Sequence, residues 1–426
     1  GLFALYPDFQ SPSSLTHPLS AGGCLVSPIV WGGWAYFYNG SSIIDIYNPK
    51  KVSLESIGNL TKLASCLDLT LEEIEEAQKL PAAERYRVQE TPKSNGSLRK
   101  VYSPHFLIRK IQRRINSRIL SNPHMITWPN HVFGSIPNQD VDTPFIAERD
   151  YINCARQHCG AKSILTLDIK DFFDNIHQSY VEDIFTNFLK FNSDVSKVLS
   201  DLCCLDGHVV QGALTSSYIA SLCLWGIEGK LVNKLRHKNL IYTRYVDDIN
   251  VSSLVSNYEF TYAVRAIEGM LDEKGLPLNL EKTKIQYVST EPLIVHGLRV
   301  GFKEPRLPSS EVRNIRAAVK NIEILASESQ YRISHAYRKD YNRCMGRVNK
   351  LHRVGHNQHG KLVTRLKNVI PLPSKKDIVR VTKIIERLEK DHTGKRHTYW
   401  YMRRFYFPFA RLKPSPFRRT DLSQML

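Results

Sequence analysis

The sequence predicts an α+β protein with a small sheet, surrounding helices and a long basic helical region toward its C-terminal end. Between Lys162 and about Val300, short runs of β-branched and aromatic residues alternate with segments of helical periodicity. Beyond Arg313 the periodicity predicts helices, with basic residues throughout. At 426 residues and 42% hydrophobic composition, the chain is long enough for two or three subdomains with a sizeable core.

The first segment differs in composition from the rest. Residues 1–60 begin with a stretch rich in Gly, Ser, Pro and aromatic residues, unlike the acidic helical stretch that follows. We therefore expect an N-terminal extension there. Its tryptophans, Trp31 and Trp34, are typical of a surface for self-association or for a second protein.

A basic segment from Thr91 onward is predicted to form a hairpin and a helix. The Asn95-Gly96 dipeptide favours a tight turn between two short strands. A helix is predicted after Pro104, because four isoleucines recur on one helical face: Ile108, Ile111, Ile115 and Ile119. Arginines and lysines occupy its other sides, so one face should pack while the others remain cationic.

The amino-acid composition limits the kinds of binding partner that the chain is expected to have. Basic residues outnumber acidic ones by 59 to 41, a formal net charge of +18, which favours polyanions and above all nucleic acid. The sequence has no run of about 18 apolar residues and no signal-like start, so we expect no membrane association and a cytoplasmic location. Its 8 cysteines form no Cys-x-x-Cys pair, which favours reduced thiols.

Two predicted strands end in carboxylates. In IYTRYVDDINVSS (241–253), strand-forming residues flank Asp247 and Asp248, which places this pair at a tight hairpin turn. In SILTLDIKDFFDNI (163–176), an apolar strand runs into Asp168. An Asp pair in a turn is commonly exposed to solvent and has no further role. A strand that ends in a buried carboxylate, however, destabilises the fold unless a partner compensates the charge.

A divalent cation is the partner that two acidic strand ends predict. If Asp168 and Asp247 face each other at about 4 Å, their repulsion is of the order of 4 kcal/mol at an effective dielectric constant of about 20. Mg²⁺ would reverse its sign, and an all-oxygen ligand set favours Mg²⁺, or Mn²⁺, over zinc. Two such ions can activate a 3′-hydroxyl and stabilise a departing pyrophosphate, which is polymerase chemistry. Asp171 and Asp174 are expected on the surface or as helix caps.

Five segments in order resemble the palm motifs of reverse transcriptases, in particular those of the bacterial retron and defence-associated (antiphage) branch: LDIKDFF, QGALTSS, YVDD, GLPLNLEKTKI and VHGLRV. The resemblance covers about residues 60–300. It implies a right-hand polymerase fold with fingers at 61–160, a palm with an antiparallel sheet at 161–300, and a helical basic thumb and tail at 301–426. The implied activity is that of an RNA-directed DNA polymerase, a nucleotidyltransferase.

The resemblance also implies roles at the catalytic centre. Asp168 and Asp247 match the two principal metal ligands, assisted by the carbonyl of Ile169 and by Asp248. Lys282 matches a lysine proposed to protonate the leaving pyrophosphate, with an ordinary loop charge as the alternative. The VHGLRV segment matches the hairpin that holds the primer terminus.

Contacts to the incoming nucleotide are implied as well. Phe173 matches an aromatic gate beneath the sugar, which would favour dNTPs over rNTPs. Gln211 and Gly212 begin a segment that lies against the base and sugar; an ordinary turn is the alternative. Three cations match the triphosphate grip of the fingers, with a solvated strand edge as the alternative: Lys93, Arg99 and Lys100.

The C-terminal third is expected to bind nucleic acid. It resembles the thumb of the family and places basic residues among helical apolar positions: Arg347, Lys350, Arg353, Lys361, Arg365 and Lys367. The aromatic and arginine-rich tail (395–419) either stacks bases or docks onto the thumb.

Three functions from different classes remain open. The first is a reverse transcriptase of antiphage defence. Its RNA template would be a dedicated non-coding RNA, and its product would be DNA. The second is template-independent or protein-primed DNA synthesis of the abortive-infection type, suggested by the altered QGALTSS motif and 20 tyrosines. The third is an RNA-binding scaffold, against which the presence of both Asp168 and Asp247 argues.

Overall fold

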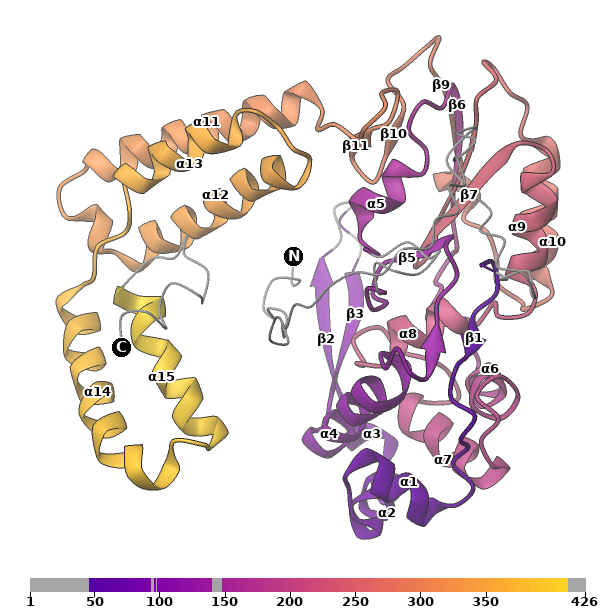
Figure 1. Cartoon of the computed structure of the whole chain (residues 1–426), viewed down its shortest axis with the longest axis horizontal. Coiled ribbons are helices and arrows are strands. Elements are labelled where there is room, and N and C mark those ends of the chain that lie inside the picture. The colour runs from indigo at the N-terminus through magenta and orange to yellow at the C-terminus, as the bar shows by residue number, and fades with distance from the viewer. Residues whose placement is uncertain (1–45, 93–95, 97, 140–147, 413–426) are drawn as a thin grey trace, which may run out of the picture. The chain divides into compact units, whose positions relative to one another are not determined.

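The computed structural model describes residues 46–92, 96, 98–139 and 148–412 (Figure 1). Trp31, Trp34, Lys93 and Asn95 lie outside these residues.

A five-stranded sheet organises the region that holds the acidic motifs. Its spatial order is β5 (Val132–Phe133), β7 (Leu240–Tyr245), β8 (Asp248–Ser253), β6 (Ser163–Asp168) and β9 (Lys284–Tyr287). β5 pairs in parallel with β7, and every other pairing in this sheet is antiparallel. The predicted antiparallel sheet is therefore confirmed, with one parallel edge strand added.

Three further strand pairs are antiparallel ribbons. These are β1 (Lys50–Lys51) with β4 (Ile126–Thr127), β2 (Tyr86–Pro92) with β3 (Leu98–Pro104), and β10 (Ile294–Val295) with β11 (Leu298–Arg299). The β2–β3 hairpin is the one that the sequence predicts after the acidic helical stretch.

The helices that precede residue 300 pack around this sheet and its approach segments. They are α1 (Leu60–Leu67), α2 (Leu71–Lys79), α3 (Ala82–Arg85), α4 (Phe106–Ile115), α5 (Tyr151–Arg156), α6 (Gln178–Asp183), α7 (Ser193–Cys203), α8 (Ser216–Leu222), α9 (Glu228–Arg236) and α10 (Thr261–Asp272). π-Helical turns continue α4 (Asn116–Leu120) and α6 (Ile184–Phe188), and a 3₁₀ turn spans Leu280–Lys282.

The two faces of the sheet differ in chemistry because side chains alternate along each strand. Leu165 and Leu167 of β6 belong to the main hydrophobic core, as do Ile249 and Val251 of β8. Their neighbours on the opposite face are polar, and the Thr166 hydroxyl donates to Asn250 Oδ1 (3.0 Å). One face thus stabilises the fold, and the other carries the polar groups.

Helix α5 and the β10–β11 hairpin cover part of the polar face. Ile164 of β6 packs there in a second, smaller core with residues of both elements: Ile152, Ala155, Val295 and Leu298. The buried His158 imidazole contacts Ser252 Oγ and Thr243 Oγ1, each at 2.7 Å. These contacts satisfy polar groups of β7 and β8 that would otherwise be buried without a partner.

The helix predicted after Pro104 is α4 with its π-helical continuation. Its four isoleucines are at most 1% exposed and belong to the main core: Ile108, Ile111, Ile115 and Ile119. Arg109, Arg113 and Arg118 are exposed on other sides. The prediction of one packed face and cationic flanks is confirmed.

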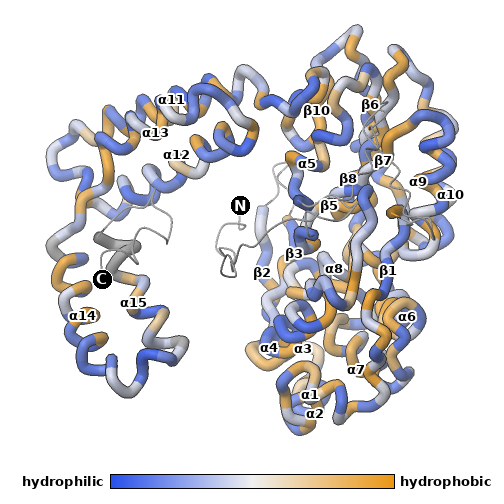
Figure 2. The backbone as a smooth tube through the Cα atoms, in the orientation of Figure 1, coloured by the Kyte–Doolittle hydropathy of each residue, from blue (hydrophilic) through white to orange (hydrophobic). Residues whose placement is uncertain are grey.

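Helices follow to the end of the described chain: α11 (Ser309–Ser327), α12 (His335–Arg353), α13 (His359–Asn368), α14 (Lys375–Lys395) and α15 (Tyr399–Leu412), with a 3₁₀ turn at Tyr331–Ile333. α11, α12 and α13 share a core of their own around Val319, Tyr341 and Leu366. Figure 2 shows much of their length as hydrophilic. In the described ranges, no helix is long and apolar enough to cross a bilayer.

The aromatic tail forms a helical hairpin with the preceding helix. Tyr401 of α15 is 8% exposed, Arg404 contacts Asp391 of α14 (3.3 Å), and the Arg380 guanidinium lies 5.0 Å from the Phe407 ring centroid. Docking therefore accounts for this part of the tail. Trp400 is 61% exposed, and the Arg403 guanidinium lies 5.5 Å from its ring centroid.

Replacing Ile111 by Ala tests the packed face of α4. Ile111 is fully buried, so removing most of its side chain should lower the free energy of unfolding by about 2–5 kcal/mol. Arg113→Ala, on an exposed side of the same helix, should change it by less than about 0.5 kcal/mol. Urea unfolding measures both, and equal losses would contradict the assignment of the two faces.

Candidate active site

Three carboxylates predicted from the sequence meet at one end of the sheet. Val246 and Asp247 join β7 to β8, and Asp248 is the first residue of β8. Asp168, the last residue of β6, is the register partner of Asp248. The N–H of Ile169 donates to the carbonyl of Asp247 (3.1 Å). The structure therefore brings the acidic ends of β6 and β8 together, as the sequence predicts.

Asp168 is a buried residue, 7% exposed. Two side chains hold its carboxylate. Lys282 Nζ lies 3.0 Å from Oδ1 and 2.9 Å from Oδ2, and Asn279 Nδ2 donates to Oδ2 (3.1 Å). The hydrogen bond to Asp168 raises the pKa of Lys282. Lys282 thus neutralises part of the charge of Asp168. The sequence did not predict this contact.

Burial and mutual repulsion perturb the other two carboxyls. Burial, then repulsion by Asp247 and Asp168, raises the pKa of Asp248 to about 6. Burial also raises the pKa of Asp247, where Asp168 adds to the rise and Lys282 and Arg99 oppose it. A concentration of negative charge that is costly to the fold is typical of a cation site.

These donors fit a hard divalent cation. All three side chains offer only oxygen, the donor atom that hard divalent cations prefer. As the side chains stand, no group of three or more His, Cys, Asp or Glu in the described part of the chain is arranged to hold an ion. A cation that binds Asp168 therefore has to compete with Lys282, whose ammonium group occupies both of its oxygens.

The cations predicted for the triphosphate are only partly placed at this site. Arg99 of β3 is close enough to the carboxylates to lower the pKa of Asp247, although burial outweighs it. Lys100 is the next residue of the same strand, so its side chain points to the opposite face of the hairpin. Lys93 lies outside the described residues.

Gly212 is explained by a close backbone contact. Its φ is +113°, and a Cβ there would lie 2.3 Å from the Tyr102 carbonyl oxygen of β3. The N–H of Tyr102 donates to the carbonyl of Gln211 (2.8 Å). The Gln211–Gly212 segment therefore seats the β2–β3 hairpin, and only glycine fits that position.

Phe173 and Ile169 lie just beyond the end of β6. Phe173 is partly buried and packs against the main core, with its ring centroid 6.0 Å from that of the buried Phe172. Ile169 is 1% exposed, so its backbone, and not its side chain, is what the site can use. Asp171 and Asp174 are exposed, as predicted.

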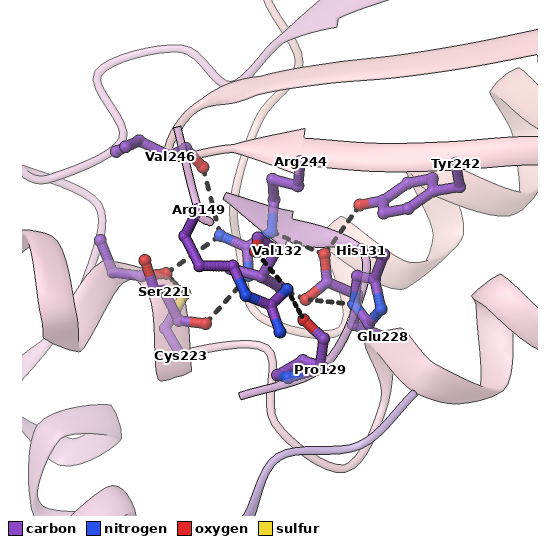
Figure 3. A network of polar contacts seen from close by, with 11 residues as sticks. Pro129, His131, Val132, Arg149, Ser221, Cys223, Glu228, Tyr242, Arg244 and Val246 are labelled. Atoms are coloured by element: carbon purple, nitrogen blue, oxygen red, sulfur yellow. Dashed lines mark hydrogen bonds and ion pairs between the residues drawn. The ribbon is translucent and has the colours of Figure 1, made fainter. Parts of the chain in front are cut away.

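A buried ion pair supports the turn between β7 and β8 from the core side, and sequence reasoning missed it. Arg244 of β7 forms a bidentate contact with Glu228 of α9, at 2.6 Å from Nε and 2.8 Å from Nη2. Its Nη1 donates to the carbonyl of Val246 (3.2 Å) and its Nη2 to that of Ser221 (3.0 Å). Figure 3 shows this guanidinium between the turn and the helix ends.

The turn that Arg244 holds is strained. Val246 has a φ of +58°, a left-handed conformation that a β-branched residue rarely adopts. The Arg244 and Glu228 side chains are 0% and 6% exposed. Burial disfavours the charge of Glu228, but Arg244 and His131 outweigh it and hold the pKa of Glu228 well below its usual range. No local pattern in the sequence indicated this pair, because Arg244 and Glu228 lie on separate elements, β7 and α9.

The VHGLRV hairpin reaches the same turn. His296 Nδ1 lies 3.9 Å from Asp248 Oδ2, and its Nε2 lies 3.3 Å from the buried Cys154 Sγ. Its ring packs on Tyr245 with centroids 4.8 Å apart. Burial lowers the pKa of His296 to about 4, so the imidazole is neutral near pH 7 and contacts Asp248 as a polar neighbour.

Comparison with known proteins identifies the family of the chain. Residues 91–325, more than half of the chain, match the family model described as reverse transcriptase (RNA-dependent DNA polymerase). The chain belongs to the reverse transcriptase family and is an RNA-directed DNA polymerase, with the right-hand polymerase fold. Enzymes of this family use divalent metal ions and copy an RNA template into a DNA product.

Within the family the chain fits the retron branch. It is 44% identical over 363 residues to the retron Ec48 reverse transcriptase of Escherichia coli, which covers 85% of this chain and 88% of that protein. It is 32% identical over 283 residues to the retron Se72 reverse transcriptase of Salmonella heidelberg (strain 579083-10), with 65% and 70% covered. Among solved structures, apo telomerase from Candida tropicalis matches with a TM-score of 0.39 and 10% identity, over 83% of this chain and 77% of that chain.

Glu228→Gln tests the ion pair behind the turn. The substitution leaves the Arg244 charge buried without a counter-charge, so the free energy of unfolding should fall by about 3–5 kcal/mol. Glu75→Gln removes an exposed partner of Lys79 at 3.6 Å and should change it by less than about 1 kcal/mol. Urea or thermal unfolding compares the two. Similar small losses in both would show that the buried pair does not stabilise the turn.

Asp248→Asn tests the repulsion among the carboxyls. Because the folded chain holds the proton of Asp248 up to a pKa of about 6, and the unfolded chain releases it near pH 4, the group lowers stability as pH rises through that window. In EDTA at pH 7.5 the variant should melt about 2 °C higher than the parent chain. The gap should close as pH falls to 4, and a gap independent of pH would contradict the explanation.

Proposed function

We propose that this chain is the reverse transcriptase of a retron-type antiphage defence system and copies part of a dedicated non-coding RNA into DNA. The observation that carries the proposal is the meeting of Asp168, Asp247 and Asp248 at the ends of β6 and β8. The net charge of +18 supports a nucleic-acid partner. The retron names of relatives up to 44% identical support the defence setting.

Asp168 and Asp247 are the proposed metal ligands, assisted by Asp248 and the carbonyl of Ile169. Mg²⁺ is the proposed ion, and Mn²⁺ suits the same oxygen donors. When bound, such ions activate the 3′-hydroxyl and stabilise the charge of the leaving pyrophosphate. Burial of the carboxylates strengthens their attraction for a cation, because the local dielectric is lower than that of water.

Lys282 is the proposed mobile cation of the site. Its ammonium group neutralises Asp168 at 2.9 Å, and its side chain is 62% exposed, so it can leave the carboxylate without unpacking the core. Once displaced, it is the proposed donor of a proton to the pyrophosphate, the role that the resemblance implies. Asn279, which also contacts Asp168, keeps that carboxylate oriented.

Nucleotide selection is proposed to depend on the segments around the carboxylates. Phe173 lies five residues after Asp168 and would exclude a 2′-hydroxyl, so dNTPs are the proposed substrates. Arg99 is the proposed contact of the triphosphate, joined by Lys93 and Lys100 if the hairpin closes. Gln211 and Gly212, which seat that hairpin, would transmit its position to the nucleotide.

The subdomain limits follow from this assignment. We propose that 61–160 are the fingers, 161–300 the palm, and 301–426 the thumb and tail, with 1–60 as an extension that self-associates or binds a second protein. The separate core of α11, α12 and α13 supports a thumb that folds around its own apolar residues.

Asp247→Asn tests the proposed catalytic centre. DNA synthesis on the co-purifying RNA, with labelled dNTPs and Mg²⁺, should fall by at least about 10³-fold, because the ligand set loses a charge that the transition state needs. Asp171→Asn, an equally conservative change at an exposed carboxylate three residues beyond Asp168, should leave synthesis within about twofold.

An Asp247→Asn chain that still extends DNA at the parental rate would refute the proposed centre. Product that partitions into phenol after RNase treatment, attached covalently to a tyrosine, would instead favour protein-primed synthesis.

A further inference from the structure

One edge of the five-stranded sheet is open. β9 (Lys284–Tyr287) is an edge strand, and among the described strands only β6 pairs with it. The opposite edge strand, β5, is covered, since Val132 and Phe133 are at most 1% exposed. In β9, by contrast, Ile285 is 40% exposed, and Val288, just after the strand, is 49% exposed. The accessible edge of this sheet is therefore β9.

The register of β9 shows which of its backbone groups face outward. The N–H of Val288 donates to the carbonyl of Lys162 (3.0 Å), which continues the antiparallel ladder between β9 and β6. In such a ladder the backbone groups of alternate residues face the neighbouring strand. Counting back from Val288 in steps of two gives the residues that face β6. Ile285 and Tyr287 lie between them, so their N–H and C=O groups point away from the sheet.

Most of these outward groups have no backbone partner. The Tyr287 carbonyl accepts from the N–H groups of Thr290 (3.1 Å) and Glu291 (3.0 Å) in the turn that follows. In the described part of the chain, no backbone group bonds to the outward N–H or C=O of Ile285, or to the N–H of Tyr287. Unpaired edge groups of this kind form hydrogen bonds with another extended strand. The edge therefore favours a β-strand as its ligand.

A cavity of about 350 Å³ borders the same edge, between β9 and the start of α10. Its apolar lining comes from Phe260, Val264, Ile285 and Tyr287. Ile285 is the register partner of Leu165, a residue of the main core, so its side chain lies on the core face of the sheet. The core face is thus uncovered where the sheet ends, and a strand added beside β9 would cover it.

Charged residues of both signs border the cavity on the α10 side. Arg265 and Glu268 are exposed and three residues apart, so they project from the same side of the helix. Within the described ranges, neither of them forms an ion pair. Lys284, the one charged residue of β9, is already paired with Glu291 (2.9 Å). Arg265 and Glu268 therefore remain available for opposite charges on a partner.

We propose that two copies of this chain associate through β9, with the two strand edges antiparallel about a two-fold axis. In that arrangement the N–H and C=O of Ile285 pair with the same groups of the other copy, and the two sheets become continuous. The axis also relates the two α10 helices, so that Arg265 of each copy lies opposite Glu268 of the other. This inference goes beyond the proposed function and does not depend on it.

A second copy fits this surface better than nucleic acid does. Glu259 and Glu268 line the cavity, and their carboxylates repel a phosphate backbone. The unpaired backbone groups suit an extended peptide, and the open core face suits apolar side chains. Another copy of β9 and α10 offers both, together with a charge of opposite sign for Arg265 and for Glu268.

Ile285→Lys tests the proposed seam. Sedimentation velocity of the full chain, with and without nuclease treatment, measures association between about 1 and 50 µM. The parent should sediment as a dimer, with twice the chain mass of 48.9 kDa, whether or not nucleic acid is present. The substitution buries a charge in the apolar seam of the dimer but leaves it exposed in the monomer, so Kd should rise at least about 30-fold.

Ile324→Lys is the matched control. Ile324 is 53% exposed on α11, so the same substitution there should leave Kd within about twofold. Equal weakening by the two lysines would reduce the effect to non-specific apolar contact and overturn the proposal. A parent chain that is monomeric at every concentration, or a dimer that disappears on nuclease treatment, would overturn it as well.

Charge reversal on α10 tests the two-fold arrangement and does not depend on Ile285. Arg265→Glu and Glu268→Arg each set like charges against one another across the axis, so each should weaken association at least about tenfold. The double variant Arg265→Glu/Glu268→Arg exchanges the signs in both copies and should return Kd to within about threefold of the parent. A double variant as weak as the single ones would contradict the pairing.

Hydrogen exchange locates the contact on the chain. Mass spectrometry of peptides that cover β9 should show the amides of Ile285 and Tyr287 exchanging at least about tenfold more slowly in the dimer than in the Arg265→Glu chain. A dimer whose β9 amides exchange as fast as those of the monomer would place the interface elsewhere and refute the proposal.

Discussion

Repulsion among Asp168, Asp247 and Asp248 is the interaction on which the rest of the site depends. The register of β6 with β8 forces two of these carboxylates into adjacent positions, and burial keeps water from screening them. The fold tolerates this charge because Lys282 and Asn279 hold Asp168. In addition, Arg244 holds the turn between β7 and β8 from the core side of the sheet. Such a concentration of repelling carboxylates lowers the stability of the fold and is typical of a cation site.

Because side chains alternate along each strand, the sheet supports the core with one face and carries the acidic groups on the other. On the core face, Leu165, Leu167 and Val251 supply apolar packing, and Arg244 uses the same face to reach the Val246 carbonyl. On the other face lie the carboxylates, Asn250 and the β10–β11 hairpin. The buried Arg244–Glu228 pair thus stabilises a strained turn from the core side of the sheet, opposite to the face that carries the carboxylates.

Particular residues show how far sequence reasoning reached. The strand ends at Asp168 and Asp247 were predictable, because β-branched and aromatic runs stop abruptly at acidic residues, and the isoleucine face of α4 followed from its period. Lys282 was placed at the site by resemblance, but its ion pair with Asp168 was not foreseen. Arg244 and Glu228, and the approach of His296 to Asp248, left no local pattern in the sequence, because they are contacts between side chains on segments far apart along the chain.

The sequence by itself determined the family, the polymerase activity, the acidic strand ends and the cationic character, since local periodicity, motif order and net charge are properties of residues in a row. Only the tertiary structure decided which groups surround each carboxylate and why Gly212 must be glycine. Burial, register and desolvation set those outcomes, and they depend on which distant segments meet once the chain has folded.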